Sequence, residues 1–353
     1  RNGVLRRLDV TCDRNGVLHH GHVASDMRDL RGRRDVAPDA RLLAHLGDGA
    51  GLHRGPLPAF GGFRDAPPDT RGAPYPLAAF SHGYGGIRYQ SPYLTEHLAR
   101  HGFVVAAVDH NHNTFMDLDM DYAAQVLAER PGDVRHMVDH VLAQSSNGHL
   151  LLEGMVRGPE YAMLGHSFGA VTTLIMAGGE LDIEHALAFC AEYDLYACAY
   201  TGTLGEVTFE DAVPDPRVAT AVAMSPGAWY IFGPDGIGLQ QVSGTLVFGG
   251  DEDDELDYLE EIRPAYEALG TPKGLATLAD AGHWGFSDLC EIVPIFDECH
   301  GEGWMDVEQV HAISVPLTTA YLGVTLLGDE RYEPWLDADH LATVEGLTWE
   351  VEE

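Results

Sequence analysis

The feature that most constrains the fold of this chain is residues 165–169, which read Gly-His-Ser-Phe-Gly and so match Gly-x-Ser-x-Gly. An apolar segment precedes them, and residues 170–174 that follow predict a helix of small side chains. Glycines at both ends allow a sharp strand-to-helix turn, and such a turn pushes the hydroxyl of Ser167 above the edge of a sheet. The motif also occurs by chance as a tight turn with a capping serine, so its surroundings decide.

Acidic and histidine candidates follow Ser167 in a fixed order along the chain. An apolar strand is predicted over residues 244–250, and three aspartates lie just past its end, within residues 251–254. His283 comes later, in a short loop after a further predicted strand. Serine, acid and histidine follow one another in this order in the α/β-hydrolase fold. The order favours Ser167 as a nucleophile and His283 as the base that removes its proton.

A glycine-rich loop lies some eighty residues before Ser167. Residues 76–80 predict a strand, and residues 81–86 continue it as Ser-His-Gly-Tyr-Gly-Gly. A loop in this place supplies one half of an oxyanion hole in such folds. The expected donors are the backbone N–H groups of Tyr84 and of Phe168, the residue after the nucleophile. Losing one such donor typically costs on the order of a hundredfold in rate.

From residue 76 onward, segments typical of strands alternate with segments typical of helices. The alternation predicts one catalytic α/β domain over residues 73–328, a mostly parallel, doubly wound sheet with helices on both faces. Periodicity is weak over residues 181–216, which predicts a lid-like insertion on the active-site side. The other expected elements are a helix starting at Ser91-Pro92, a strand over 103–108, a helix around 134–142, strands over 218–224 and 244–248, and a helix over 310–327 interrupted at Pro316.

The two ends of the chain differ in composition from this domain. Residues 1–72 hold twelve Arg and nine Asp but neither Lys nor Glu, and their only aromatic residues are Phe60 and Phe63. So few large apolar residues predict an irregular N-terminal extension with at most one or two edge strands. Deleting residues 1 to about 60 is expected to leave a foldable core. Residues 329–353 are expected to form an acidic C-terminal tail.

The charge balance limits the partners that the chain can have. Acidic residues outnumber Lys and Arg by 55 to 21, so the formal net charge at pH 7 is −34. Nucleic acid and anionic membrane surfaces are not expected as partners, because like charges repel. No run of eighteen or more apolar residues occurs, so no membrane span is expected. Lys273 is the only lysine. A monomer is expected.

The five cysteines include two closely spaced pairs. Cys190 lies near Cys198 and Cys290 lies near Cys299, while Cys12 is left over. The spacing suggests two local disulfides in a secreted or periplasmic protein; buried free thiols in a cytosolic enzyme are the alternative. No Cys-x-x-Cys occurs, and the histidine-rich residues 19–22 and 109–112 lack helical metal-ligand spacing. Neither a metal nor an organic cofactor is expected.

Four stretches carry a resemblance to a known family. They are residues 80–83, 97–110, 165–169 and 282–290. Together they resemble the bacterial α/β-hydrolases catalogued as predicted dienelactone hydrolases, which are similar to the platelet-activating-factor acetylhydrolase type II group. The resemblance implies an α/β-hydrolase fold and serine-hydrolase chemistry.

The chain departs from these relatives at two points, and the resemblance also ranks the acids. Dienelactone hydrolases proper use a cysteine nucleophile, where this chain has Ser167. Relatives usually carry a tryptophan-tyrosine-proline stretch ahead of the oxyanion loop, and residues 1–72 contain none. They also read Gly-x-x-Asp after the acid-bearing strand. Counted from Gly250, that pattern selects Asp253 as the third member of the triad, ahead of its neighbours Asp254 and Asp251.

A looser similarity runs to cutinases and polyester hydrolases. In those enzymes an aromatic residue follows the oxyanion-loop glycine, as Tyr84 does, and a tryptophan follows a proline-bearing strand end, as Trp229 does. The similarity implies that both rings contact substrate. His166 and Trp284, the sequence neighbours of Ser167 and His283, are also expected to contact it. Two rings there could hold a flat aromatic acyl group, or they could simply line an ordinary esterase pocket.

These features together predict a serine carboxylic-ester hydrolase. It is expected to form an acyl-enzyme with short to medium acyl esters or aromatic esters, and polyesters are among its candidate substrates. A lipase-like or phospholipid acetyl-ester hydrolase is the alternative within the same chemistry. A catalytically silent binding protein with a hydrolase fold is the alternative from another class.

Overall fold

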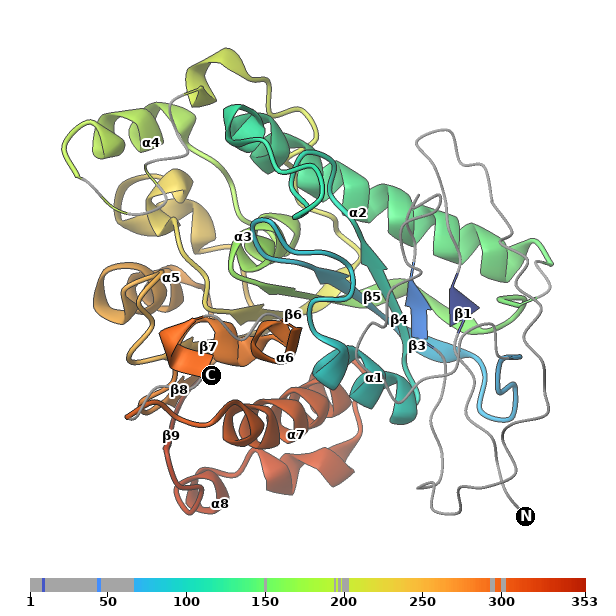
Figure 1. Ribbon diagram of the computed structural model, residues 1–353. Coiled ribbons are helices and arrows are strands. Elements are labelled where there is room, and N and C mark those ends of the chain that lie inside the picture. The colour runs from blue at the N-terminus through green and yellow to red at the C-terminus, as the bar shows by residue number, and fades with distance from the viewer. Residues whose placement is uncertain are drawn as a thin grey trace.

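A computed structural model gives the structure of the protein. It describes residues 8–9, 43–45, 67–148, 151–193, 195, 198, 203–292, 296–299 and 303–353. One twisted sheet runs through the centre, in the strand order β1-β2-β4-β3-β5-β6-β7-β8-β9 (Figure 1). All neighbouring strands pair in parallel except the last, β9, which is antiparallel to β8.

The elements have the following bounds. The strands are β1 Leu8–Asp9, β2 Leu43–His45, β3 Tyr75–Ser81, β4 Val104–Val108, β5 Val156–His166, β6 Val218–Met224, β7 Thr245–Gly250, β8 Lys273–Leu278 and β9 Leu347–Glu352. The α-helices are α1 Pro92–Arg100, α2 Ala123–Ser146, α3 Phe168–Met176, α4 Ile183–Cys190, α5 Arg263–Ala268, α6 Leu289–Ile292, α7 Val307–Thr325 and α8 Ala338–Leu341. Short helical turns include η1 Met120–Tyr122, η3 Leu204–Glu206, η4 Trp229–Phe232, η6 Tyr258–Ile262, η7 Trp284–Phe286, η8 Asp297–Cys299 and η9 Glu330–Trp335.

Apolar side chains alternate along the strands and bury both faces of the sheet. On β3, Ala78 and Phe80 pack with α1 and α7, whereas Leu77 and Ala79 pack with α2. A third cluster joins α3, α4, α5 and η4 on the same face as α2. Figure 1 shows these two helical layers, with α1, α7 and α8 on one side and α2 and α3 on the other. The molecule has the α/β-hydrolase fold, doubly wound as predicted.

The site is positioned by the parallel strands at the middle of the sheet. Their carboxyl ends meet at one edge, because parallel strands all run in the same direction. At that edge β3 leads into the loop at residues 81–86, and β5 leads into Ser167. β7 leads into Asp253, and β8 leads into the loop that carries His283. The four candidate catalytic segments are thus brought to one edge.

Two helices contain an internal proline, and the sequence predicts an interruption at one of them, Pro316. α2 is longer than the helix expected around residues 134–142 and contains Pro131, and α7 continues through Pro316. A proline inside a helix costs about 3 kcal/mol, because it lacks the N–H group and crowds the preceding turn. Both helices bury a long apolar face that offsets this cost. The expected interruption at Pro316 is therefore wrong.

The C-terminal segment is part of the sheet rather than an acidic tail. Residues 329–353 form η9, α8 and β9, and β9 pairs with β8 from Leu347 to Glu352. The ring of Trp349 covers Gly274 so closely that a methyl group there would lie 2.8 Å from it. The buried ammonium of Lys273 donates to the carbonyls of Tyr266 and Glu267 and pairs with Glu352 at 3.4 Å. These contacts fix the edge of the sheet.

At the opposite edge, β2 pairs with β4 and β1 pairs with β2. The two strands agree with the edge strands expected within residues 1–72. Cys12, Phe60, Phe63 and the histidines of residues 19–22 lie outside the described residues.

Both predicted disulfides are confirmed. Cys190 is bonded to Cys198 within residues 181–216, and Cys290 is bonded to Cys299 in the loop after His283. The segment expected to be lid-like contains α4 and η3. Over the described part of the chain, helices fall short of the length and apolarity that crossing a bilayer requires.

Candidate active site

Ser167 lies on a strained turn between β5 and α3. Its φ is 56° and its ψ is −121°, a backbone conformation that residues with a side chain seldom adopt. The flanking glycines are required by close packing. A Cβ atom on Gly165 would lie 2.1 Å from the carbonyl oxygen of Gly169, and one on Gly169 would lie 1.9 Å from that of Ser81. The Gly-x-Ser-x-Gly spacing thus presents the serine at the end of the strand, as predicted.

Asp253 and His283 are joined by a hydrogen bond, and both are buried. The imidazole donates from Nδ1 to Oδ2 of Asp253 at 2.8 Å. The other carboxylate oxygen accepts the backbone N–H groups of Glu255 and Leu256 at 3.1 and 2.8 Å. Three donors therefore fix the carboxylate. Because Nδ1 carries the proton toward Asp253, Nε2 is left as the basic nitrogen of His283.

The two neighbouring aspartates differ from Asp253 in exposure. Asp251 and Asp254 are exposed, and Asp251 accepts the backbone N–H of Asp280 at 2.7 Å. Of the three aspartates within residues 251–254, the structure brings only Asp253 to the imidazole.

The charges of this pair stabilise each other. Burial lowers the pKa of His283, but the charge and hydrogen bond of Asp253, together with the nearby carboxylates of Glu298 and Glu255, outweigh that effect, so the net pKa lies above its ordinary value. Burial raises the pKa of Asp253, and the imidazole and backbone donors outweigh that effect and lower it. The pair is therefore suited to hold an imidazolium that forms when His283 takes a proton.

A chain of buried hydrogen bonds ties the loop of residues 81–86 to the serine turn and to the histidine loop. Gln90 accepts the N–H of Gly83 through Oε1 at 2.7 Å and donates through Nε2 to Nδ1 of His166 at 2.7 Å. His166 then donates from Nε2 to the carbonyl of His283 at 3.0 Å. Burial lowers the pKa of His166 to about 3, so the ring is neutral. His166 and Gln90 thus link three loops next to Ser167.

The sequence did not identify Gln90. It precedes the Ser91-Pro92 helix start, and a lone glutamine at a helix entrance carries no spacing signal. His166 is fully buried, so the structure places it behind the turn and not on the surface that substrate would touch.

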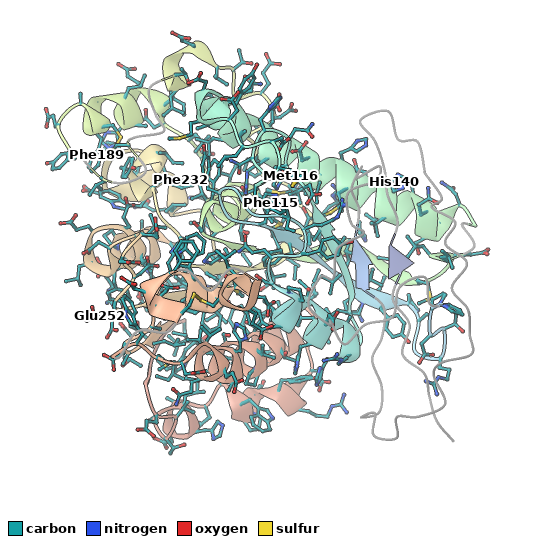
Figure 2. All side chains as sticks on the ribbon, in the orientation of Figure 1. Phe115, Met116, His140, Phe189, Phe232 and Glu252 are labelled. Carbon is teal, nitrogen blue, oxygen red and sulfur yellow. A yellow bond between two sulfur atoms is a disulfide. The ribbon has the colours of Figure 1, made fainter. Side chains whose placement is uncertain are left out.

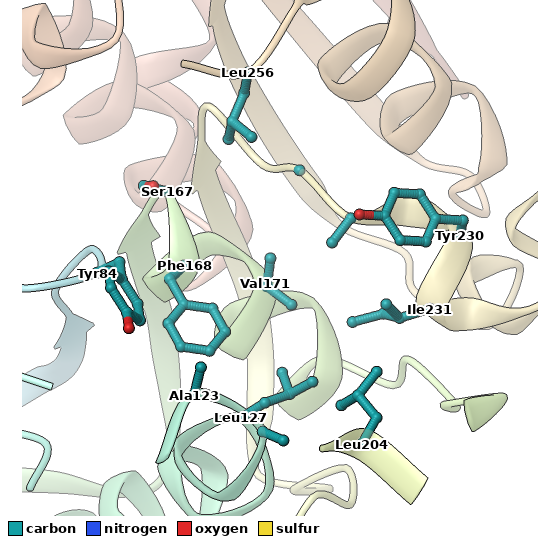
Figure 3. Close-up of a pocket in the computed structure, with 13 residues that line it drawn as sticks. Tyr84, Ala123, Leu127, Ser167, Phe168, Val171, Leu204, Tyr230, Ile231 and Leu256 are labelled. Carbon is teal, nitrogen blue, oxygen red and sulfur yellow. The ribbon is translucent and has the colours of Figure 1, made fainter. Parts of the chain in front are cut away.

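Tyr84 and Phe168 lie on the two loops that would supply the oxyanion donors. Their rings are 5.9 Å apart and both line a cavity that opens beside Ser167 (Figure 3). The cavity has a volume of about 90 Å³ and is almost wholly apolar. Its walls are formed by residues of α2, α3, η3, η4 and the loops after β6 and β7: Ala123, Ala124, Leu127, Val171, Leu204, Gly227, Ala228, Tyr230, Ile231 and Leu256.

The two tryptophans expected to contact substrate do not line this cavity. Trp229 is absent from the cavity wall, where its neighbour Tyr230 takes the place. The Trp229 indole donates to the carbonyl of Glu260 at 2.8 Å and packs edge-on against Phe189 at 5.6 Å. Trp284 lies 5.1 Å from the ring of His283 and stacks on Phe296 at 4.8 Å. The alternation of buried and exposed positions in η4 is too short to be read from sequence.

Glu298 is a further ionisable group near His283. It lies in the loop closed by the Cys290–Cys299 disulfide, and its carboxylate accepts the backbone N–H of Trp284. Burial raises the pKa of Glu298 to about 7.

Within the described segments no three His, Cys, Asp or Glu side chains gather into a metal-binding group.

Comparison with known proteins supports an ester hydrolase. Residues 63–129 match the model of the family described as platelet-activating factor acetylhydrolase, isoform II. The chain is 28% identical to Cutinase est2 of Thermobifida alba over 161 residues, which are 40% of this chain and 48% of that protein. It is 31% identical to Cutinase est1 of the same organism over 113 residues, which are 32% of this chain and 34% of that protein. The chain thus spans about half of the first relative's length and a third of the second's.

Proposed function

We propose that this α/β-hydrolase, similar to ester hydrolases, is a serine carboxylic-ester hydrolase that works through an acyl-enzyme. One observation carries the proposal: the buried Asp253–His283 hydrogen bond lies at the same sheet edge as the strained turn of Ser167. His283 is the general base, and Asp253 holds it in the tautomer that leaves Nε2 basic. The two disulfides support a secreted or periplasmic location.

Catalysis would proceed in two steps. Nε2 of His283 takes the proton of Ser167 while Oγ attacks the ester carbonyl, and the resulting oxyanion is held by the N–H groups of Tyr84 and Phe168. His283 then gives the proton to the leaving alkoxide as the carbonyl re-forms. Water repeats the sequence on the acyl-enzyme and releases the acid.

The cavity favours a short aliphatic acyl group. Its volume of about 90 Å³ is below the roughly 150 Å³ of a dry protein cavity that takes up benzene. An aromatic acyl group would therefore have to lie in the mouth, near Tyr84, and not in the cavity. Trp229 does not line the cavity, because its indole is hydrogen-bonded to the carbonyl of Glu260. One of the two rings that would hold an aromatic acyl group between them is therefore missing from the cavity wall.

A second candidate, lipase-like action on water-insoluble esters, is favoured by an exposed apolar segment. Within residues 115–122, Phe115, Met116 and Met120 are 61%, 55% and 62% exposed. Figure 2 labels Phe115 and Met116. The segment leads directly into Ala123 and Ala124 of the cavity wall. An aggregated neutral ester could rest on it, whereas an anionic surface would be repelled by the net charge of −34.

An acyl-length series tests the proposal. We expect turnover of p-nitrophenyl esters to be highest for short acyl groups, to fall with chain length and to be low for the benzoate. Leu204→Ala should shift the optimum toward longer chains because Leu204 is buried in the cavity wall. Leu187→Ala is the matched control, since Leu187 lies in the same 181–216 segment but is 39% exposed and outside the wall. Absence of turnover on every ester would refute the function.

Two further substrates separate the candidates. A steep rise in rate when an ester exceeds its solubility limit would favour lipase-like action. Release of aromatic acids from an amorphous aromatic polyester film, above the level of a Ser167→Ala control, would extend the substrates to polyesters.

A further inference from the structure

One arginine lies beneath the loop of residues 81–86 and is completely buried. Arg130, from the middle of α2, is 0% exposed and is the largest fully buried side chain among the described residues. Burying a cation is costly unless hydrogen bonds replace its water. Burial lowers the pKa of Arg130 to about 9, which still leaves it charged at neutral pH. The cost of this buried charge calls for a role that a neutral side chain could not fill.

The guanidinium donates to four acceptors, and two of them are loop carbonyls. Nη1 donates to the carbonyl of His82 at 2.6 Å and to Oγ of Ser81 at 3.2 Å. Nη2 donates to the carbonyl of Gly83 at 3.1 Å and to Oδ1 of Asn113 at 2.6 Å. None of these acceptors carries a charge, so the positive charge is not neutralised by direct contact with a carboxylate.

The carbonyl of Gly83 belongs to the same peptide group as the N–H of Tyr84. That peptide is trans, and in a trans peptide the C=O and N–H bonds point in opposite directions. Holding the carbonyl toward Arg130 therefore aims the N–H of Tyr84 away from it. A cation on the carbonyl also polarises the peptide, which strengthens its N–H as a donor.

Arg130 also contacts the other half of the proposed oxyanion hole. Its Cζ atom lies 4.5 Å above the ring of Phe168, and that ring lies 5.9 Å from the ring of Tyr84. A cation over an aromatic face is attracted to it, and more so when both are desolvated. One side chain thus braces the residues whose N–H groups would bind the oxyanion.

Neighbouring side chains keep the loop carbonyl directed toward Arg130. The N–H of His110 donates to Nε2 of His82 at 3.2 Å, so the proton of His82 is on Nδ1, which donates to the carbonyl of Gly83 at 2.7 Å. The N–H of Gly86 reaches the same carbonyl at 3.1 Å. Burial lowers the pKa of His82 and of His110 well below the ordinary value, so both rings are neutral and Arg130 is the cation that contacts the carbonyls of His82 and Gly83.

We propose that Arg130 is a positioning residue for the oxyanion hole: it holds the Gly83–Tyr84 peptide in its donating orientation and places a positive charge behind it. The inference rests on the proposed ester hydrolysis, where this peptide would bind the oxyanion. Arg130 itself does not touch substrate.

The test compares Arg130→Met with Arg217→Met. Arg217 is the matched control because it also pairs with polar partners, Asp215 and Asp139, and lies 5.9 Å from the ring of Tyr161, away from the site. We expect Arg130→Met to lower kcat on p-nitrophenyl butyrate on the order of a hundredfold, the typical loss of one oxyanion donor, with little change in KM. The inhibition constant of a trifluoromethyl ketone, which forms an oxyanion on the serine, should rise by a similar factor. Arg217→Met should leave kcat unchanged.

Further measurements keep the proposal open to refutation. Arg130→Lys keeps the charge but not the fork, so its kcat should lie between the wild type and Arg130→Met. If Arg130→Met fails to fold, Arg130→Lys carries the test. The NMR chemical shift of the Tyr84 amide in either variant reports the orientation of the Gly83–Tyr84 peptide, whether or not the protein hydrolyses esters. An absence of ester hydrolysis in the wild type would refute the proposed function but not this inference. A folded Arg130→Met enzyme with kcat within about threefold of wild type, or an unmoved Tyr84 amide, would overturn the inference.

Discussion

Two serine–histidine–aspartate sets occur among the described residues, and they differ in access. In the second set, His110 donates from Nδ1 to Asp133 at 2.9 Å and accepts the hydroxyl of Ser81 at 3.0 Å through Nε2. Ser81 is 0% exposed, and its oxygen also accepts from Arg130. No substrate can reach it. Matching residue types are therefore not sufficient for catalysis; the cavity beside Ser167 distinguishes the proposed site.

Removing the proposed nucleophile should abolish ester hydrolysis. We expect Ser167→Ala and His283→Ala each to lower kcat on the order of 10⁴-fold or more, because members of a triad act as a unit. Ser81→Ala is the matched control: it should weaken the buried network and lower the melting temperature, yet retain the triad. An active-site organophosphate followed by mass spectrometry should label Ser167 in the wild type. Labelling at another serine would displace the assignment.

The acid of the triad should be visible in the pH profile. His283 must be neutral to act as a base, so kcat/KM should rise as pH increases through its pKa, which Asp253 holds above the ordinary value. In Asp253→Asn this support is lost, so the rising limb should move to lower pH and kcat should fall on the order of 10³–10⁴-fold. Asp251→Asn and Asp254→Asn should change kcat little. If either exposed aspartate had the larger effect, Asp253 would lose its role.

Among the helices and strands, the sequence predicts those that have a regular apolar pattern or a motif. It does not predict features that depend on packing against residues far away in the sequence. β3, β4, β6, β7 and the second half of β5 are mostly apolar and alternate with helices, and the turn at Ser167 has its own motif, so the sequence predicts both. The extent of α2 past Pro131 is not, because it depends on burial against the sheet. Trp229 and Tyr230 are adjacent, and only the fold decides which one reaches the cavity. The sequence did not predict β9 for a related reason: a half-buried edge strand retains many charged residues, so it resembles an acidic tail.

β9 should contribute to stability. We expect Trp349→Ala to lower the free energy of unfolding by about 2–3 kcal/mol, less than for a fully buried tryptophan because Trp349 is only half-buried over Gly274. Val351→Ala on the same strand is the control, since Val351 is 52% exposed and should change stability by under about 0.5 kcal/mol. Urea denaturation followed by fluorescence and circular dichroism measures both. Equal stabilities for the two variants would mean that β9 is dispensable.

For the whole molecule, the dominant physical property is its charge. With a net charge of −34, acidic side chains repel one another across the surface, and this repulsion opposes the compact state. Added salt shortens the range of the repulsion from about 10 Å at 0.1 M to about 3 Å at 1 M. The fold should therefore become more stable as salt increases.

Thermal unfolding in increasing NaCl checks this expectation. The melting temperature should rise by several degrees between 0.1 and 1 M, since the gain comes from screening. Sodium salts of different anions should be compared at equal ionic strength. Screening depends on ionic strength alone, whereas exclusion of the salt from the protein surface depends on the anion. A melting temperature that falls with NaCl would show that attractive ion pairs, and not repulsion, dominate the surface.

The burial of Lys273 makes the molecule a reporter of its own opening. An acylating reagent finds a single side-chain amine in the entire sequence, and in the folded state that amine is 5% exposed beneath β9. Mass spectrometry of the peptide containing Lys273 would then measure the fraction of molecules in which β8 and β9 have separated during the reaction. Amine-coupling chemistry for attaching the protein to a surface would, for the same reason, leave the side chains of the folded protein unmodified.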